Sequence, residues 1–221
     1  MRSLAVAGIA LVLVVIVLFL GTCGRSEVEA PTTTTSTTTS TTSTTSSTTT
    51  TTTVDPASLG TLPPVDGIGA PVLDRDSSVT TVGLDTVHFG MTLRAAQLAA
   101  GSRFSPASPV GECYLVTPDE APDGISFWVA GGTIERVDID EPGITTRSGA
   151  GIGDSEDRIH DMFGDRIQAT ALPDGTGNLL AYVPRDESDK DYRVMFQTDG
   201  EKVVRFWSGK LPWAGMLEPC G

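Results

Sequence analysis

Histidine and cysteine are scarce in this chain, and their scarcity argues against metal chemistry. The 221 residues include two histidines, His88 and His160, and three cysteines. Neither histidine belongs to a His-x-x-x-His or Cys-x-x-Cys motif, which are the spacings that bring ligands together on one metal. We therefore interpret both histidines as solvated or partly buried side chains and predict no metal site.

The sequence also lacks the motifs of nucleophilic and nucleotide-dependent enzymes. No Gly-x-Ser-x-Gly is present, and the glycine-rich residues 149–153 lack the Lys-Ser/Thr that completes a phosphate-binding loop. Asp138 and Asp140 share one face of a predicted strand, with Glu141 beside them, so a Ca²⁺ site or an acid/base pair is one reading. A solvated strand end is the simpler one. We predict no catalytic residues and no cofactor.

Lysine and arginine are few in this chain. The chain has 15 Lys and Arg residues against 28 Asp and Glu residues, for a net charge of −13. An acidic surface without a basic cluster argues against binding to nucleic acid and to anionic lipid headgroups. Binding to a cationic partner is an alternative, although an acidic surface is also explained by the need for solubility alone.

What the chain does have at its N-terminus is a membrane-directed segment. Residues 4–21 are all apolar or small, a length between a long signal-peptide core and a short spanning helix. The sequence Leu-Gly-Thr-Cys that ends at Cys23 resembles a bacterial lipobox, although Thr22 departs from the usual Gly, Ala or Ser. Lipidation at Cys23, a spanning anchor and plain secretion are the three alternatives. Each assigns residues 1–23 to targeting or anchoring and places the rest outside the cytoplasm.

A stalk follows this segment. Residues 32–53 are only Thr and Ser, which bury too little apolar surface to offset the entropy of ordering them. Residues 54–84 are rich in Pro, Gly and Asp and are expected to be mostly irregular. We therefore predict a disordered stalk and linker over residues 24–84 and a folded domain over residues 85–221.

The remaining cysteines suggest a disulfide bond. If Cys23 carries lipid or lies in the membrane, Cys113 and Cys220 are left as a pair in an oxidising compartment. Their bond would close a loop of about 107 residues, which stabilises by roughly 4 to 5 kcal/mol in the chain-entropy view. Two buried free thiols are the alternative.

The folded region contains an internal repeat. Residues 89–101 and 152–164 share a turn glycine, a hydroxyl residue, a short amphipathic stretch and a closing glycine, with the two glycines 11 residues apart in both copies. The hydroxyls of Thr92 and Ser155 can cap a helix that the second glycine ends. We therefore predict two short helices. Their buried faces should consist of Leu93, Ala96 and Ala100 in one helix and of Ile159, Met162 and Phe163 in the other.

Each predicted helix precedes a hairpin pattern. Alternating apolar residues flank Gly-Gly at residues 131–132 and Asp-Gly at residues 199–200, which are favoured hairpin turns. Earlier strands are expected at residues 112–116 and 178–183. The predicted fold is α+β: a tandem repeat of a helix plus antiparallel strands, residues 85–145 and 146–221, with the helices on one face of the sheet.

This pattern of apolar-Gly-Met-Thr, a helix ending in Gly and then strands resembles the repeat of the SmpA/OmlA outer-membrane lipoproteins (BamE type) and of the tandem-repeat β-lactamase inhibitory protein. It also resembles membrane-anchored actinobacterial proteins with a Thr-rich spacer. The resemblance covers about residues 85–210. It implies an assembly subunit, an inhibitor or an uncharacterised envelope protein, and it does not choose among these functions.

Two tryptophans are the candidate binding residues. Trp128 and Trp207 lie in the predicted hairpins beside Phe127 and Phe206, and neighbouring strand residues face opposite ways. We expect the phenylalanines in the core and the tryptophans on the open face, where they would contact an envelope protein. The predicted function is therefore a membrane-tethered, non-enzymatic protein-binding domain. A glycan or small-molecule module and a carboxylate-dependent hydrolase are the alternatives.

Overall fold

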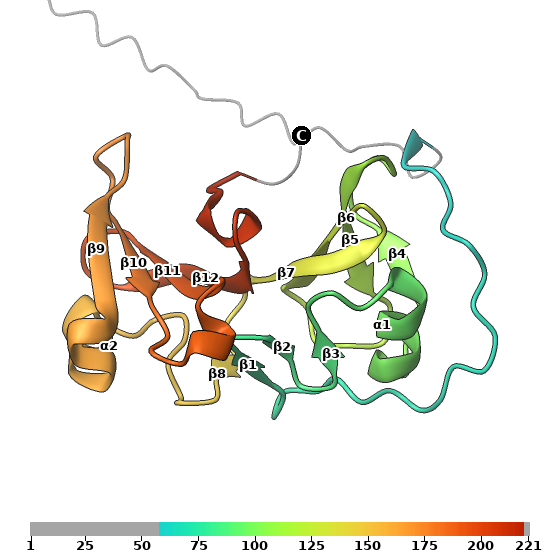
Figure 1. Cartoon of the computed structure of the whole chain (residues 1–221), viewed down its shortest axis with the longest axis horizontal. Helices are drawn as coiled ribbons and strands as arrows, with labels where there is room; N and C mark the ends of the chain where they lie inside the picture. The colour runs from blue at the N-terminus through green and yellow to red at the C-terminus, as the bar shows by residue number, and fades with distance from the viewer. Residues whose placement is uncertain (1–57, 219–221) are drawn as a thin grey trace, which may run out of the picture. The chain divides into compact units, whose positions relative to one another are not determined.

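The computed structural model describes residues 58–218, which belong to one structural unit with an α+β fold dominated by strands (Figure 1). The predicted membrane segment, Cys23, the Thr/Ser run and Cys220 lie outside the described residues. Among the helices that the structure does describe, none has the length and apolarity to cross a membrane.

The largest element is an eight-stranded sheet with the order β4-β5-β6-β7-β12-β11-β10-β9, in which every neighbouring pair is antiparallel. The first four strands in this order are β4 (Phe104–Pro106), β5 (Cys113–Pro118), β6 (Ile125–Ala130) and β7 (Thr133–Ile139). The other four are β9 (Ile167–Ala171), β10 (Asn178–Tyr182), β11 (Tyr192–Thr198) and β12 (Val203–Lys210). Strands β7 and β12 meet at the centre, so the sheet joins the two halves of the chain.

The two predicted helices are confirmed, with their caps. The Thr92 side chain accepts a hydrogen bond from the Ala95 N–H at the start of α1 (Leu93–Ala100). Ser155 does the same for the Arg158 N–H at the start of α2 (Glu156–Phe163). Glycines with positive φ, 62° at Gly101 and 60° at Gly164, end the two helices. At Gly101 no other residue fits, because a Cβ atom would lie 1.8 Å from the Ala70 carbonyl oxygen.

The predicted hairpins are confirmed as β6–β7 and β11–β12, and the expected strands at residues 112–116 and 178–183 correspond to β5 and β10. The sequence reading missed the two outermost strands. Strand β4 has three residues and ends in proline, and β9 is Ile-Gln-Ala-Thr-Ala, so neither has the run of alternating large apolar residues that marks a half-buried strand.

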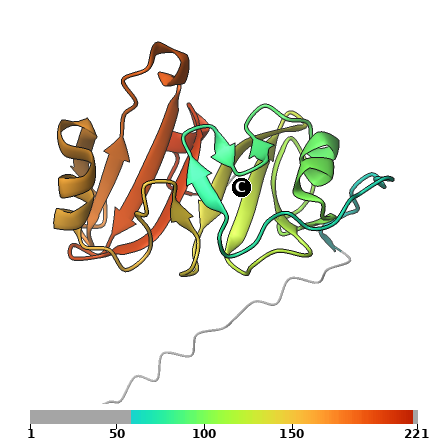
Figure 2. The ribbon, with the colours of Figure 1, turned by 90° about the horizontal axis from the view of Figure 1, so that it is seen from below.

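A second, small sheet includes five residues of the segment 54–84, whose described part is otherwise mostly irregular, as expected. It contains β1 (Ser78–Thr80), β2 (Gly83–Leu84), β3 (Val87–His88) and β8 (Thr145–Thr146) in the order β3-β2-β1-β8. Seen from below, it crosses the middle of the molecule between α1 and α2 (Figure 2). Val65, Leu73 and Val79 are buried, so the folded body begins before residue 85.

One apolar core lies on a single face of the large sheet. It includes Phe127, Val137 and Phe206, all with no exposed surface, together with Leu93 and Ala96 of α1 and Ile159 of α2. The predictions that Phe127 and Phe206 are core residues, and that Leu93, Ala96 and Ala100 of α1 and Ile159 of α2 are buried, are confirmed. Met162 and Phe163 are partly buried against the same core. Burial of this apolar surface is the main stabilising contribution.

The prediction that Trp128 and Trp207 are exposed is wrong. Both face away from the apolar core, yet each is 0% exposed. The guanidinium of Arg136 lies between them, 4.1 Å from the Trp128 ring centroid and 4.3 Å from that of Trp207. A cation between two aromatic faces is an attractive arrangement that strengthens when water is excluded. The aromatic patch expected on the surface is therefore an internal cluster.

The chain that follows β12 covers this cluster. The Trp207 indole N–H donates to the carbonyl of Ala214, 2.8 Å away, in a 3-10 helix, η4 (Trp213–Gly215). Arg136 Nη1 donates to the Trp213 and Met216 carbonyls. Without this segment, both tryptophans would be exposed to water on the outer face of the sheet. Strand alternation in the sequence indicates which side of the sheet a residue faces, but not whether another segment covers that side.

Asp138 completes the cluster as the partner of Arg136. Its carboxylate accepts hydrogen bonds from Arg136 Nε and, over 2.7 Å, from the Trp128 indole N–H. Burial raises the pKa of Asp138 and lowers that of Arg136, while each partner opposes the shift in the other. Because each charge depends on the other, removal of either would leave an uncompensated buried charge. Asp138 is thus a structural residue, whereas Asp140 and Glu141 are exposed.

Cys113 begins β5, is half-buried, and is disulfide-bonded. It lies next to the end of β12, sharing a surface pocket with Lys210, Leu211 and Trp213. The C-terminal segment therefore passes close to Cys113. Pairing with Cys220 stays a prediction, because that residue lies outside the described part of the chain.

We predict that Trp207→Ala destabilises the protein by about 3 to 5 kcal/mol, because it opens a cavity and uncovers Arg136. Chemical denaturation followed by circular dichroism measures the change. Val204→Ala is the control, because Val204 lies on the same strand but is 42% exposed, and we expect a change within about 0.5 kcal/mol. Equal stability of the Trp207 variant and the wild type would contradict the described packing.

Candidate functional site

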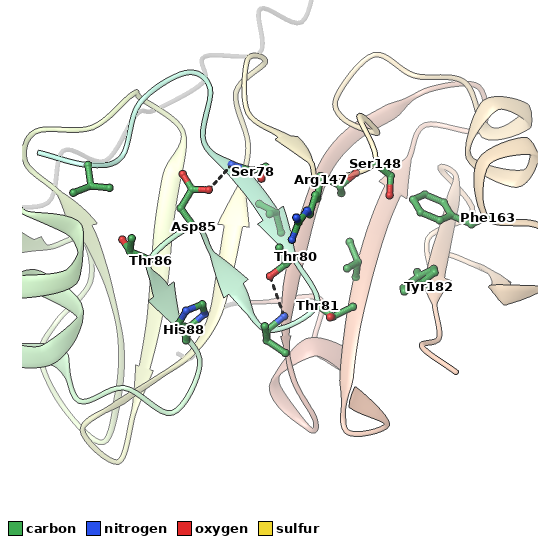
Figure 3. A pocket seen from close by; sticks show the side chains of 15 residues that line it. Ser78, Thr80, Thr81, Asp85, Thr86, His88, Arg147, Ser148, Phe163 and Tyr182 are labelled. Carbon is green, nitrogen blue, oxygen red and sulfur yellow. Dashed lines mark hydrogen bonds between the residues drawn. The ribbon is translucent and has the colours of Figure 1, made fainter. Parts of the chain in front are cut away.

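A groove of about 860 Å³ opens beside the small sheet (Figure 3). Residues 78–82, from β1 and the turn that follows it, line its middle, and Asp85, Thr86 and His88 line one end. Arg147 and Ser148, which follow β8, face them, and Phe163, Tyr182 and Val194 close the other end. The groove is thus built from separate parts of the chain that include residues 78–88, residues 146–148, Phe163, Tyr182 and Val194. Its volume is in the range of pockets that hold small molecules or short peptide segments.

Three hydrogen bonds hold the small sheet in place: one to the large sheet, one to Asp189 in the turn before β11, and one between β1 and the residue that follows β8. The buried Ser208 hydroxyl of β12 donates to the Thr80 carbonyl over 2.7 Å. The Thr81 hydroxyl donates to Asp189 Oδ2 over 3.0 Å, and the Arg147 backbone N–H donates to the Val79 carbonyl over 2.9 Å. These bonds hold the floor of the groove and the backbone of Arg147 in fixed positions.

Arg147 is the one Lys or Arg among the residues that line the groove. Its side chain is exposed, and in residues 58–218 the structure gives its guanidinium no ion pair and no hydrogen bond. In a chain of net charge −13, an unpaired cation in a groove attracts an anionic group. A guanidinium recognises carboxylate or phosphate oxygens through two parallel hydrogen bonds.

The rest of the groove is rich in hydroxyl groups and has aromatic rings at one end. Its polar lining includes six Ser and Thr side chains: Ser78, Thr80, Thr81, Thr86, Thr146 and Ser148. The rings of Phe163 and Tyr182 pack against each other, with centroids 5.0 Å apart. Arg166 lies over the Tyr182 ring and donates to its hydroxyl over 2.8 Å, which holds that ring in place. The groove therefore combines hydrogen-bonding groups, a cation and an apolar end.

The two histidines differ in position. His88 is exposed and lines the groove, whereas His160 is exposed on α2 and does not. Within the described residues the His88 ring is hydrogen-bonded to neither a hydroxyl nor a carboxylate, so no activated nucleophile of the serine–histidine type is assembled there. Those residues also contain no group of three or more His, Cys, Asp or Glu side chains placed to hold a metal ion.

The glycine-rich residues 149–153 form a turn. Gly149 N–H donates to the Thr146 carbonyl, and Gly153 N–H donates to the Val203 carbonyl just before the Ser155 cap of α2. The run therefore leads the chain from β8 into the second helix. The N–H groups of Gly149, Ala150, Gly151 and Gly153 are bonded within the protein, so these four are not free to bind a phosphate.

Sequence reasoning missed the groove because most of its floor comes from residues assigned to the irregular linker. The sequence does contain a signal for a strand in this segment. Residues 78–82 read Ser-Val-Thr-Thr-Val, and β-branched residues favour strands. The aromatic end was also unassigned, because Phe163 was read only as a core residue of α2.

No protein-family model matches this chain, and neither a curated protein nor a solved structure matches it. The function therefore has to be inferred from the geometry of the groove and from the organisation of the chain. Arg147 and the surrounding hydroxyl groups are the residues on which that inference depends.

We predict that Ser208→Ala loosens the small sheet. Loss of the hydroxyl leaves the Thr80 carbonyl without this partner in a buried place, which costs about 1 to 3 kcal/mol. Hydrogen exchange should increase at residues 78–84 while β5 and β6 keep their protection. Ser105→Ala, at an exposed site in β4 on the large sheet, is the matched control and should leave exchange at residues 78–84 unchanged.

Proposed function

We propose that this protein is a membrane-tethered, extracytoplasmic binding domain that holds an acidic segment of another envelope protein in the groove around Arg147. The apolar residues 4–21 and the Thr/Ser run of residues 32–53 support the tether. The unpaired, exposed Arg147 in a hydroxyl-lined groove is the observation that carries the ligand assignment. An extended segment suits an open groove whose floor is a strand and whose far end is aromatic.

This proposal moves the binding surface from the large sheet to the groove. The outer face of the large sheet is covered at its centre by residues 213–216, and Trp128 and Trp207 are buried beneath them. Neither tryptophan can contact a partner unless this segment leaves. The groove has no such cover among the described residues.

We further propose that the domain arose by duplication, in keeping with its resemblance to the SmpA/OmlA and β-lactamase-inhibitory repeats. Corresponding hydrogen bonds support it: Gly90 N–H donates to Ile134 O, and Gly153 N–H, 63 positions later, donates to Val203 O. The cap residues form matching isolated bridges, Thr92 with Thr133 and Ser155 with Lys202. In each half a helix precedes four strands, of which the last lies at the centre of the sheet.

Binding is favoured over catalysis by the position of the perturbed carboxylate. A hydrolase that uses carboxylates would hold one with a raised pKa in its cleft. Here burial raises the pKa of Asp138, but this residue lies under the C-terminal segment in an ion pair with Arg136, and it does not line the groove. Its shift therefore has a structural cause.

A glycan is the second candidate ligand, and a specific observation favours it. Sugars stack on aromatic rings and hydrogen-bond to hydroxyl groups, and the groove offers Tyr182 and Phe163 near six Ser and Thr side chains. The tryptophans first considered for this role are buried. An acidic sugar would also use Arg147, so a binding test has to include both ligand classes.

We predict that Arg147→Gln weakens binding of acidic peptides by about 10- to 100-fold, the effect of losing hydrogen bonds to a charged group. The test uses an array of overlapping peptides from the exported proteins of the organism that makes this chain. The array is probed with the full chain in detergent, and each peptide that binds is then titrated. Asp→Asn and Glu→Gln versions of each bound peptide should lose the same affinity as the protein variant does.

Arg94→Gln is the matched control, because Arg94 is exposed on α1 and does not line the groove. It removes the same charge and should leave binding unchanged. Equal effects of both variants would mean that net charge alone governs binding. Bound peptides without Asp or Glu, or binding only to a neutral glycan array, would overturn the acidic-segment assignment.

We predict that mass spectrometry of the protein extracted from membranes finds residues 1–22 missing and a diacylglyceryl group on Cys23. The lipobox-like Leu-Gly-Thr-Cys motivates this outcome. An intact N-terminus in the membrane fraction would instead identify a spanning anchor, and protein found only in the medium would contradict the tether.

A further inference from the structure

Strand β9 forms an open edge of the large sheet. Figure 1 shows it at one end of the sheet, paired with β10 on one side only. Four of its five residues, Gln168 to Ala171, are exposed. Such an edge presents unpaired backbone groups that can join another strand.

The hydrogen bonds that flank β9 show which of its backbone groups face β10. Val183 N–H donates to the Arg166 carbonyl, and Leu172 N–H donates to the Gly177 carbonyl, both over 2.9 Å. Residues in an antiparallel strand alternate between pointing toward a neighbour and away from it. The even-numbered residues of β9 therefore bond to β10, and the odd-numbered residues point to the open edge.

The odd-numbered residues differ in how far they are satisfied. Ile167 N–H donates to the Gly164 carbonyl at the end of α2. The N–H groups of Ala169 and Ala171 have no partner among residues 58–218. Together with the carbonyls of Ile167 and Ala169, they form a short, regular row of donors and acceptors.

The opposite edge of the sheet, strand β4, has no free outward N–H group among its described residues. Strand β4 also points alternate residues outward, at positions 104 and 106. Phe104 N–H donates to the side-chain oxygen of Gln97 in α1 over 3.0 Å, and Pro106 has no N–H. Proline and a covering helix are common means of protecting an edge. The chain thus blocks one edge and leaves the other open.

Charge also permits close approach at β9. Residues 167–173 read Ile-Gln-Ala-Thr-Ala-Leu-Pro and contain no charged side chain. Two copies of a chain with a net charge of −13 repel each other over most of their surfaces. A neutral stretch with small side chains is where two copies can meet at the lowest electrostatic cost.

We propose that β9 pairs antiparallel with β9 of a second copy of this chain, about a twofold axis at Ala169, to join two sheets into one. In this register Ala169 lies opposite Ala169 of the second copy, and Ile167 lies opposite its Ala171. The free N–H of Ala169 meets the Ala169 carbonyl of the second copy, and that of Ala171 meets its Ile167 carbonyl. Every free donor of both edges is satisfied in this register. A register about Thr170 would satisfy the same donors but would place Ala169 opposite Ala171 of the second copy, so crosslinking at position 169 distinguishes the two.

The expected dimer is weak in dilute solution. A single pair of five-residue strands buries less surface than the roughly 1,200 Å² of a stable protein interface. Copies held in one membrane meet at a far higher effective concentration. The pairing is separate from the groove and does not depend on what the groove binds.

The test uses the full chain in phosphatidylcholine vesicles and mild oxidation. Residues directly opposite each other have Cβ atoms about 4.5 to 5.5 Å apart, close enough to favour a disulfide bond after small adjustments. Ala169→Cys should give a covalent dimer well above the background of the wild-type chain, which keeps its native cysteines. Gln168→Cys is the matched control: it is equally exposed, but it lies opposite Thr170 and should give much less dimer.

Ala169→Pro checks that the pairing uses the backbone. In the proposed register, a chain with Ala171→Cys should crosslink to a second copy with Ile167→Cys. Ala169→Pro removes an outward N–H and no bond to β10. Added to both chains, it should abolish this crosslink while circular dichroism shows an unchanged fold. Equal crosslinking at positions 168 and 169, crosslinking that survives Ala169→Pro, or no dimer in vesicles would each overturn the proposal. Crosslinking of position 169 to a different protein, with no dimer, would assign the edge to that protein instead.

Discussion

The antiparallel contact between β7 and β12 is the constraint on which the rest of the structure depends. It pairs Val137 with Ser208 and Arg136 with Gly209, residues more than 70 positions apart in the chain. The approach is close: a Cβ atom on Gly209 would lie 2.9 Å from both the Arg136 Cβ atom and the Glu135 carbonyl oxygen. Glycine at this position allows the two central strands to meet, and with them the two halves of the sheet.

Both faces of this central pair are used for stability. On one face Val137 and Phe206 belong to the apolar core, which also contains residues of both helices. On the other, Arg136 lies between Trp128 and Trp207 beneath the C-terminal segment. A buried cation is costly unless it is paired and hydrogen-bonded. Asp138 and two backbone carbonyls satisfy Nε and Nη1 of Arg136, whereas its buried Nη2 has no hydrogen-bond partner among the described residues. The cluster therefore ties the end of the chain to the centre of the sheet.

Because both faces of the central strands are covered, the surfaces that could bind a ligand or a partner lie away from the centre of the sheet. The small sheet lies between α1 and α2 (Figure 1), with β3 beside α1, and Ser208 of β12 fixes it through the Thr80 carbonyl. Arg147, held by its backbone bond to Val79, is thus presented on a rigid base rather than on a free loop. The open edge of β9 lies beyond the groove's aromatic end, so ligand binding and self-association would use different parts of the second half.

Local signals in the sequence were sufficient for the elements with short-range causes. Thr92 and Ser155 cap helices through bonds to residues three positions away, and glycine pairs turn the chain within a hairpin, so nothing distant was needed to predict them. The alternation of Phe127 with Trp128 correctly gave the side of the sheet on which each lies. It could not give their exposure.

What only the tertiary structure decided involves residues brought together across the fold. Trp207 is buried because residues 213–216 return over it, Arg147 faces a groove because β8 pairs with the distant β1, and Ala169 is at an edge because no further strand follows β9 in the sheet order. Each outcome depends on contacts between segments that the chain separates widely or orders unexpectedly. The sequence by itself determined the caps, the turns and the facing of strand residues, because these are set within a few residues along the backbone; the covering of a face, the shape of a groove and the openness of an edge were set by long-range packing.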